Sequence, residues 1–206
     1  MTFFLPNFII KGIFQHIVSR MTSYTSDTRF DQLASLSKGE YENCVFANCR
    51  FVSADFSGFV FIDCSFSDCD LSLVMLNNTA FRGVKFHNCK MLGLRFDAAN
   101  DFGLSFAFDS CQLNHSSYYK LRLKKTIFKN CQLLDADFSE CDLTNSVFDS
   151  CNLAQAQFDN SNLEKVDFRS AINYTIDPAR NRITKARFSL SGLPGLLTTF
   201  DLVIED

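Results

Sequence analysis

Cysteine and histidine are the residues of this chain whose side chains could bind a metal ion or attack a substrate. The 206 residues include nine cysteines and three histidines. Zinc-binding cysteines are usually separated by two to four residues, whereas these lie at multiples of five on either side of one break. This spacing favours small buried side chains over metal ligands, and an odd number of inward thiols suits a reducing compartment. We therefore predict no metal site, no cofactor and a cytoplasmic location.

One local group has the residue types of a nucleophilic site: His115, Ser116, Ser117 and Asp109. In the repeat described below, Ser116 is expected to point inward and His115 outward, which opposes a hydrogen bond between them. The other two histidines lie far away along the chain, and no phosphate-binding loop, dinucleotide fingerprint or paired acid and base appears. We predict no catalytic residues and no enzymatic activity, so the protein is expected to work through its surface.

A period of five residues organises most of the chain. The central residue of each five is apolar from residue 41 onward: Tyr41, Phe46, Phe51, Phe56, Phe61, Phe66, Leu71, Leu76, Phe81, Phe86, Met91, Phe96. After a break at residues 97–107 the series resumes with a shift of two: Phe108, Leu113, Tyr118, Leu123, Phe128, Leu133, Phe138, Leu143, Phe148, Leu153, Phe158, Leu163, Phe168. The residue two before each centre is usually small, and all nine cysteines occupy that position. The residue two after it is often Asn or Asp, which tolerates turn geometry.

This period fits neither an α-helix nor a plain strand, because both would rotate successive centres onto different faces. A chain that turns a corner every five residues keeps the centre and the residue two before it inside. Four such sides close a square coil of about twenty residues, in which each coil hydrogen-bonds to the next at about 4.8 Å. Spacing by twenty places Cys111, Cys131 and Cys151 on one inner edge, and the expectation is that Cys49, Cys69 and Cys89 lie on another.

The repeat units at 136–140, 141–145 and 161–165 resemble the A(D/N)LXX unit of the pentapeptide-repeat family. The resemblance covers about residues 39–172. It implies an all-β fold, a right-handed quadrilateral parallel β-helix, with a short C-terminal helix and strand as a cap. The sequence is similar to the Qnr and MfpA branch of this family. It lacks the projecting loops of many Qnr rods, because the break adds only two residues.

The expected organisation has three parts: a leader at 1–26, the β-helix at 27–188, and a cap at 189–206. Pro6, Asn7 and Lys11 interrupt the apolar leader well below the roughly 20 residues of a membrane span. We interpret it as a disordered leader or, because Met21 offers a second start, as an artefact of start-site choice; a membrane-surface helix is the alternative.

The apolar tail is expected to cover the exposed end of the coil. It predicts a short helix followed by a strand at Leu202-Val203-Ile204. Its layout is similar to the C-terminal cap of the Qnr and MfpA branch, where that element pairs two rods, and capping alone is the alternative. The residues expected to form this cap and a homodimer contact are Leu193, Leu196, Leu197, Phe200, Leu202 and Ile204.

The net charge of −3 predicts no direct binding to nucleic acid or membrane. Residues 120–129 concentrate basic side chains, whereas residues 130–164 contain no Lys or Arg. One interpretation of this acidic segment is an ordinary solvated face. The other is that its acids repeat about 5 Å apart on successive coils and imitate the phosphates of a DNA duplex. The candidate partner-binding acids are Asp135, Asp137, Glu140, Asp142, Asp149, Asp159 and Glu164.

Two functions from different classes follow. The resemblance to the Qnr and MfpA branch implies a non-enzymatic rod that mimics DNA and binds a type II topoisomerase such as DNA gyrase. The missing loops make protection against quinolones doubtful. The alternative is a structural or scaffolding repeat protein with an unrelated protein partner.

Overall fold

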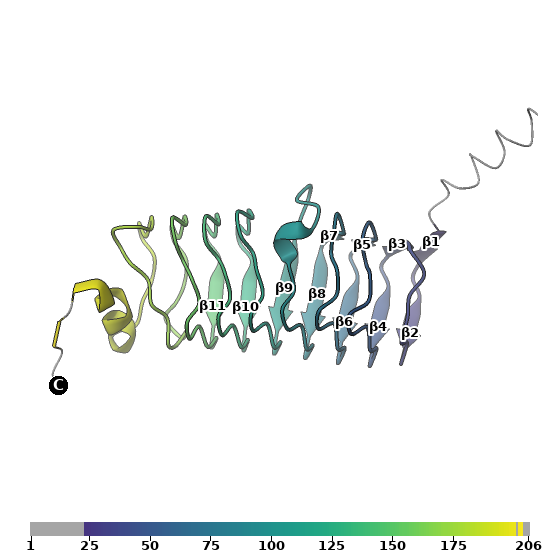
Figure 1. Ribbon diagram of the computed structural model, residues 1–206, viewed down its shortest axis with the longest axis horizontal. Helices are drawn as coiled ribbons and strands as arrows, with labels where there is room; N and C mark the ends of the chain where they lie inside the picture. Colours follow the sequence, from purple (N-terminus) through teal and green to yellow (C-terminus); the bar gives the residue numbers. More distant parts are fainter. Residues whose placement is uncertain (1–22, 201, 204–206) are drawn as a thin grey trace, which may run out of the picture.

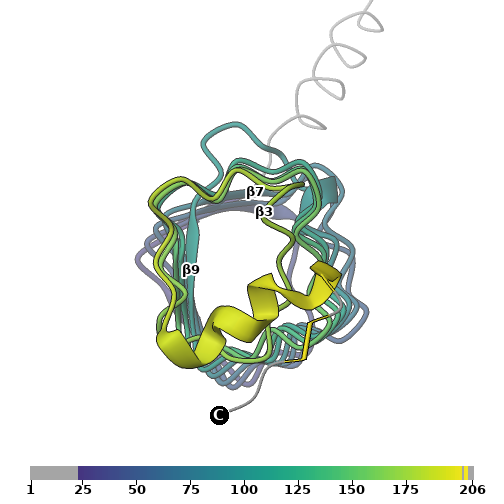
Figure 2. The same cartoon turned by 90° about the vertical axis from the view of Figure 1, so that its left-hand side faces the viewer.

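The computed structural model describes residues 23–200 and 202–203 of the chain. These residues form a rod with a four-sided cross-section, in which successive coils stack along the long axis (Figures 1 and 2). The expected leader falls outside the described residues, apart from residues 23–26. No helix in the described part is long and apolar enough to cross a membrane.

Two parallel sheets form two neighbouring sides of the rod. We name the sides by their centres in the coil that begins at Tyr41: Tyr41 on the first side, Phe46 on the second, Phe51 on the third and Phe56 on the fourth. The first side contains β1 (Ser23–Ser26), β3 (Gly39–Glu42), β5 (Val60–Ile62) and β7 (Ala80–Arg82). The second contains β2 (Arg29–Asp31), β4 (Val45–Ala47), β6 (Ser65–Ser67), β8 (Val84–His87), β9 (Phe106–Asp109), β10 (Ile127–Lys129) and β11 (Val147–Asp149). Isolated parallel bridges, such as Arg50 to Asp70, join the coils on the other sides.

The five-residue period is confirmed in the interior and at the corners. Every predicted centre from Tyr41 to Phe168 is buried, and so are all nine cysteines. The residue two after the centre takes a left-handed conformation, with φ near +50° at Asn43, Asn48 and Asp63. Asn and Asp tolerate this conformation better than most residues, so their recurrence makes the chain turn at each corner.

One column of stacked phenylalanine rings runs through the rod behind the second side. Neighbouring rings are nearly parallel, with centroids 4.6 Å apart between Phe46 and Phe66 and 5.4 Å apart between Phe168 and Phe188. The column consists of Phe30, Phe46, Phe66, Phe86, Phe108, Phe128, Phe148, Phe168 and Phe188. It fixes the register of the coils, because each ring packs on the ring above and the ring below.

The solenoid begins before the expected boundary at residue 26. Strand β1 already pairs with β3, with Ser23 opposite Gly39 and Ser26 opposite Glu42. The first coil is therefore four residues shorter than the twenty-residue coils that follow, which hides it from a search for residues five apart. The remainder of the expected leader, residues 1–22, lies outside the described residues.

The break at residues 97–107 lengthens one coil by two residues, since β8 pairs with β9 in a register that places Phe86 opposite Phe108. This shift corrects the expectation of two separate cysteine edges. The amide of Gln112 donates to the carbonyl of Cys89, so Cys111 continues the line of Cys89. Six of the nine cysteines thus form one ladder: Cys49, Cys69, Cys89, Cys111, Cys131 and Cys151.

The C-terminal cap is helical, but its helices are of the 3-10 type. They are η2 (Leu190–Leu196) and η3 (Thr198–Phe200), and η2 lies across the end of the last coil (Figure 2). The predicted strand is not formed by Leu202 and Val203, which are exposed and have no strand partner. Ile204 lies outside the described residues. A strand needs a neighbouring backbone edge, and none is offered to these two residues within the described part of the chain.

Candidate protein-binding surface

The seven predicted acidic residues do not form one strip. Asp142 and Glu164 flank centres of the first side, and Asp149 flanks a centre of the second. Asp135 lies at the corner after the third side, while Asp137, Glu140 and Asp159 lie on the fourth side or its corner. The chain passes all four sides within each coil, so acids that are close in sequence are distributed around the rod.

Five of these acids lie within ion-pair distance of a basic side chain on a neighbouring coil: four face Lys or Arg, and Asp135 faces a histidine, which is a cation only when it is protonated. Lys120 Nζ lies 3.4 Å from Glu140, and Lys124 Nζ lies 3.0 Å from Asp142. Two basic side chains of the segment 120–129 therefore face acids on the next coil. The remaining three pairs are His115 with Asp135, Arg180 with Asp159 and Arg182 with Glu164. Asp137 and Asp149 are the two members of the set without a basic side chain within ion-pair distance in the described part.

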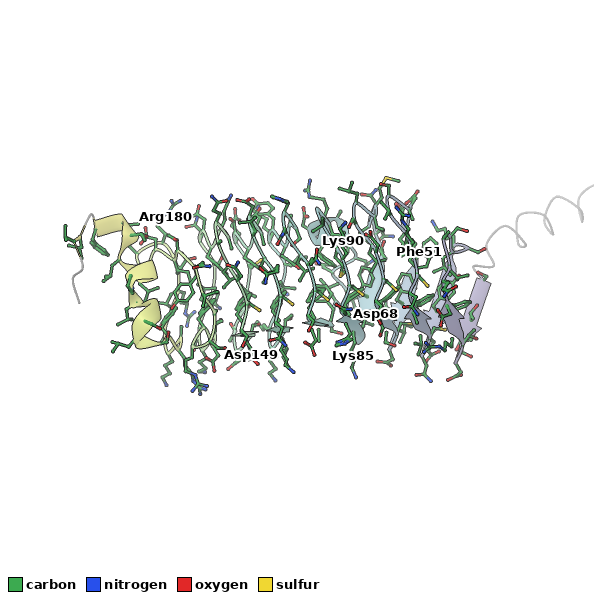
Figure 3. All side chains as sticks on the ribbon, turned by 90° about the horizontal axis from the view of Figure 1, so that it is seen from below. Phe51, Asp68, Lys85, Lys90, Asp149 and Arg180 are labelled. Atoms are coloured by element: carbon green, nitrogen blue, oxygen red, sulfur yellow. The ribbon has the colours of Figure 1, made fainter. Side chains whose placement is uncertain are left out.

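Neighbouring hydrogen-bond donors stabilise the charged form of Asp142. Burial alone raises the pKa of Asp142, but donors on Thr144 and Lys124 outweigh it, so the pKa falls below its usual value. Figure 3 shows Lys85, Asp149 and Arg180 on the outside of the rod. Several acids of the outer wall thus lie beside basic side chains on a neighbouring coil, which differs from the uniform negative charge of duplex DNA.

His115 and Ser116 do not form a catalytic pair. Ser116 is buried and its Oγ donates to the carbonyl of Leu113 at 2.6 Å. His115 is exposed and its Nδ1 lies 3.5 Å from Asp135. Asp109 lies 3.7 Å from both His87 and Lys129. The inward and outward directions predicted for the serine and the histidine are confirmed.

The cysteines act as buried hydrogen-bond donors. Cys69 Sγ lies 3.5 Å from the carbonyl of Phe46 in the preceding coil, and Ser161 Oγ makes the equivalent bond to Phe138 at 2.7 Å. Burial raises the pKa of Cys64 to about 11 and that of Cys141 to about 12. Within the described residues no group of three or more His, Cys, Asp or Glu side chains is arranged to hold a metal ion.

A short loop on the first side is a surface feature that was not among the candidate binding residues. It follows η1 (Phe96–Ala98) and stands out from the wall between β7 and β9 (Figures 1 and 2). Phe102 in this loop is 76% exposed, more than any other aromatic side chain in residues 23–200. The guanidinium carbon of Arg82 lies 5.7 Å from the centre of its ring. The break in the five-residue period located this loop, although its small size suggested that nothing would project.

The C-terminal cap divides the predicted dimer residues into two groups. Leu196 is buried against the end of the coil and Leu197 is half-buried, whereas Leu193, Phe200 and Leu202 are exposed. Leu190 and Val203, which were not among the predicted dimer residues, are 86% and 87% exposed. The cap therefore buries Leu196 against the coil and presents an apolar outer surface formed by three predicted dimer residues together with Leu190 and Val203.

Comparison with known proteins identifies the repeat. The family model described as the pentapeptide repeat region matches residues 40–106 and 104–176. A search of curated protein sequences finds no match. The chain is similar to the full-length structure of QnrB1, a plasmid-mediated fluoroquinolone resistance protein, with 16% identity and a TM-score of 0.58 over 87% of this chain and 100% of that one. HetL, a pentapeptide repeat protein involved in heterocyst differentiation regulation from the cyanobacterium Nostoc sp. strain PCC 7120, matches at 13% identity and a TM-score of 0.37 over 87% of this chain and 94% of that one. At these identities the similarity establishes the fold alone.

Proposed function

This chain belongs to the pentapeptide-repeat family, and we propose that it is a non-enzymatic rod that binds another protein through its outer wall. The inward direction of the repeat residues supports this proposal, because it leaves only corner and flanking side chains to meet other molecules. The nine buried free thiols fit a reducing compartment such as the cytoplasm.

The observation that carries the proposal is the exposed phenylalanine on the projecting loop. A largely exposed aromatic ring contributes little to the core, and aromatic residues are enriched where partners bind. The loop that carries Phe102 projects from the wall (Figure 2), so its exposed ring can enter a pocket that a flat wall could not reach. We infer that the first side is the binding side.

The charges around the loop define the partner. Arg82 lies under the Phe102 ring, and the coil after the loop carries Arg122 and Lys125 on the same side. Neither Arg122 nor Lys125 has an ion-pair partner among the described residues, unlike Lys124. The surface therefore fits a protein with an apolar pocket that is rimmed by Asp or Glu.

A type II topoisomerase is the specific partner to test first. The rod shape and the similarity to QnrB1 favour it. The paired acids argue against DNA mimicry as its mechanism, because a carboxylate already paired with Lys120 or Lys124 offers little charge to a basic DNA groove. If the rod binds a topoisomerase, we expect the contact to be made by the loop of the first side.

We also propose that two chains pair through the outer surface of the C-terminal cap. The support is the concentration of exposed apolar side chains at one end, including Leu190, Phe200 and Val203. Such a surface is covered in most water-soluble proteins. Analytical ultracentrifugation tests this pairing: Phe200→Glu should convert a dimer into a monomer, and a monomeric natural chain would contradict it.

The binding side can be tested before the partner is identified. A photoreactive phenylalanine analogue placed at position 102 should cross-link a protein in the native host, whereas the same analogue at Ile127, an exposed apolar position on the second side, should not. Arg122→Glu with Lys125→Glu should weaken the cross-link, and Lys85→Glu on the second side should leave it unchanged. Equal cross-linking at both positions would refute the assignment of the first side.

A supercoiling assay with purified DNA gyrase, with and without ciprofloxacin, separates the two kinds of partner. Inhibition or protection that Phe102→Ala abolishes would identify a topoisomerase contact. No effect at micromolar protein removes gyrase as the partner and leaves the scaffolding role, provided that the cross-link at position 102 is still obtained.

A further inference from the structure

The N-terminal end of the rod is open within the described residues. Strands β1 and β2 lie at the ends of their sheets, and each has a hydrogen-bonded neighbour on one side only. Phe30, the first ring of the aromatic column, is half-buried, as are Leu33 and Leu36, whereas Phe46 in the next coil is fully buried. The opposite end is covered by η2, which buries Leu196. An uncovered end with free backbone groups promotes association between edges.

The sequence before β1 has the composition that could cover this end. Apolar residues recur at Ile10, Ile13, Phe14, Ile17, Val18 and Met21, and the residues between them are polar or glycine. Intervals of three and four residues predict an amphipathic helix with one apolar stripe. Twelve residues of helix span about 18 Å, and a five-residue side of the coil spans at most about 17 Å. The stripe is therefore long enough to cross the end.

We propose that residues 10–21 lie across the N-terminal end of the rod, with their apolar stripe on Phe30, Leu33 and Leu36. Thr22 is the only residue between Met21 and β1, which begins at Ser23. This short connection keeps the stripe close to the open end at a high effective concentration. A second copy or a membrane surface must instead be recruited from solution, so the segment's own rod is the favoured site.

Hydrogen exchange in the full-length chain tests the contact directly. Ile13→Asp with Ile17→Asp places two charges in the stripe, and Gln15→Asp with Ser19→Asp places the same two charges on the opposite face of the predicted helix. We expect the first pair to increase amide exchange in residues 23–31 by about tenfold or more. The second pair should leave it at the wild-type rate. Exchange in β10 and β11 should not change in either variant, which controls for loss of the fold.

Equal exchange of residues 23–31 in the wild type and in both double variants would overturn the proposal. Protection that depends on protein concentration would assign the cover to a second copy and would also overturn it. Co-sedimentation with phosphatidylcholine vesicles containing phosphatidylglycerol, lost in the Ile13 and Ile17 variant while exchange stays unchanged, would assign the segment to a membrane surface instead.

Discussion

Tyr118 is the one tyrosine among the centres of the C-terminal half of the rod, and its hydroxyl has no hydrogen-bond partner among the residues that the structure describes. The side chain is 0% exposed, and its ring stacks on Phe138 at 4.7 Å and on Phe96 at 5.0 Å. Burial raises the pKa of its phenol well above the usual value, so the hydroxyl stays neutral. Burial of a hydroxyl without a protein partner is unfavourable.

We predict that Tyr118→Phe stabilises the protein. Leaving a polar group buried and unpaired costs about 1–3 kcal/mol, and the substitution removes that cost while the ring keeps both stacking partners. Part of the gain is offset by the small void left by the oxygen, so the expected increase in the free energy of unfolding is about 1–2 kcal/mol. For a chain of this size the melting temperature should rise by about 2–4 °C per kcal/mol.

The same substitution at Tyr41 is the matched control, for which we expect a change in the free energy of unfolding of the opposite sign. Tyr41 is also buried, but its hydroxyl donates to the carbonyl of Ser37 at 2.6 Å. Tyr41→Phe should therefore destabilise the protein by about 0.5–1.5 kcal/mol. Guanidinium chloride titrations followed by circular dichroism measure both. A loss of stability in both variants would refute the argument that the Tyr118 hydroxyl is unsatisfied.

Three further predictions concern the core, the thiols and the cap. Phe148→Ala should lower stability by about 3–5 kcal/mol, because the ring is buried between Phe128 and Phe168, whereas Asp149→Asn should change it by less than about 1 kcal/mol; equal denaturation midpoints would contradict the inward direction of residue 148. The pKa of the buried Cys64 and Cys141 thiols is raised, to about 11 and about 12, above the 9.0 of the unfolded state, so their contribution to stability is complete below pH 9 and is lost as the pH rises toward those values. Melting curves should accordingly be flat from neutral pH to pH 9 and fall above it, with slow reaction of native thiols toward Ellman's reagent and no effect of EDTA. Gly195→Ala should loosen the cap, since its new Cβ would collide with the backbone oxygen of Tyr174, and limited proteolysis should then cleave near η2; an unchanged cleavage pattern would show that the cap accommodates the methyl group.

The interior was predictable from the sequence because packing imposes a short, strict period. Each centre occupies the same environment, so an apolar residue recurs every five positions, and the left-handed corners select residues such as Asn43 and Asp63 for a local steric reason. Neither signal depends on what lies on the neighbouring coil, so both can be recognised in a single stretch of sequence.

The outer wall was less predictable, because its contacts join residues about twenty positions apart. The segment around Lys120 and Lys124 looked like a separate basic patch, although Glu140 and Asp142 lie beside these residues on the next coil. The prediction of two separate cysteine edges was wrong for a related reason. Counting by twenty from Cys89 misses Cys111, since two added residues shift the register. The start of the first coil, residues 23–26, was assigned to the leader, because this coil is shorter and places Phe30 sixteen rather than twenty residues before Phe46.

The break at residues 97–107 shows how the rod accommodates extra chain. Phe86 and Phe108 stack at 5.3 Å across it, a separation within the range of the rest of the column, and the additional residues are displaced outward. The entropic cost of closing a loop grows slowly with its length, so this loop of the first side can accept longer insertions while the coils beneath it keep their shape. A rod of this kind can change its binding partner by lengthening or exchanging this one loop, and foreign peptides can be inserted at the same position.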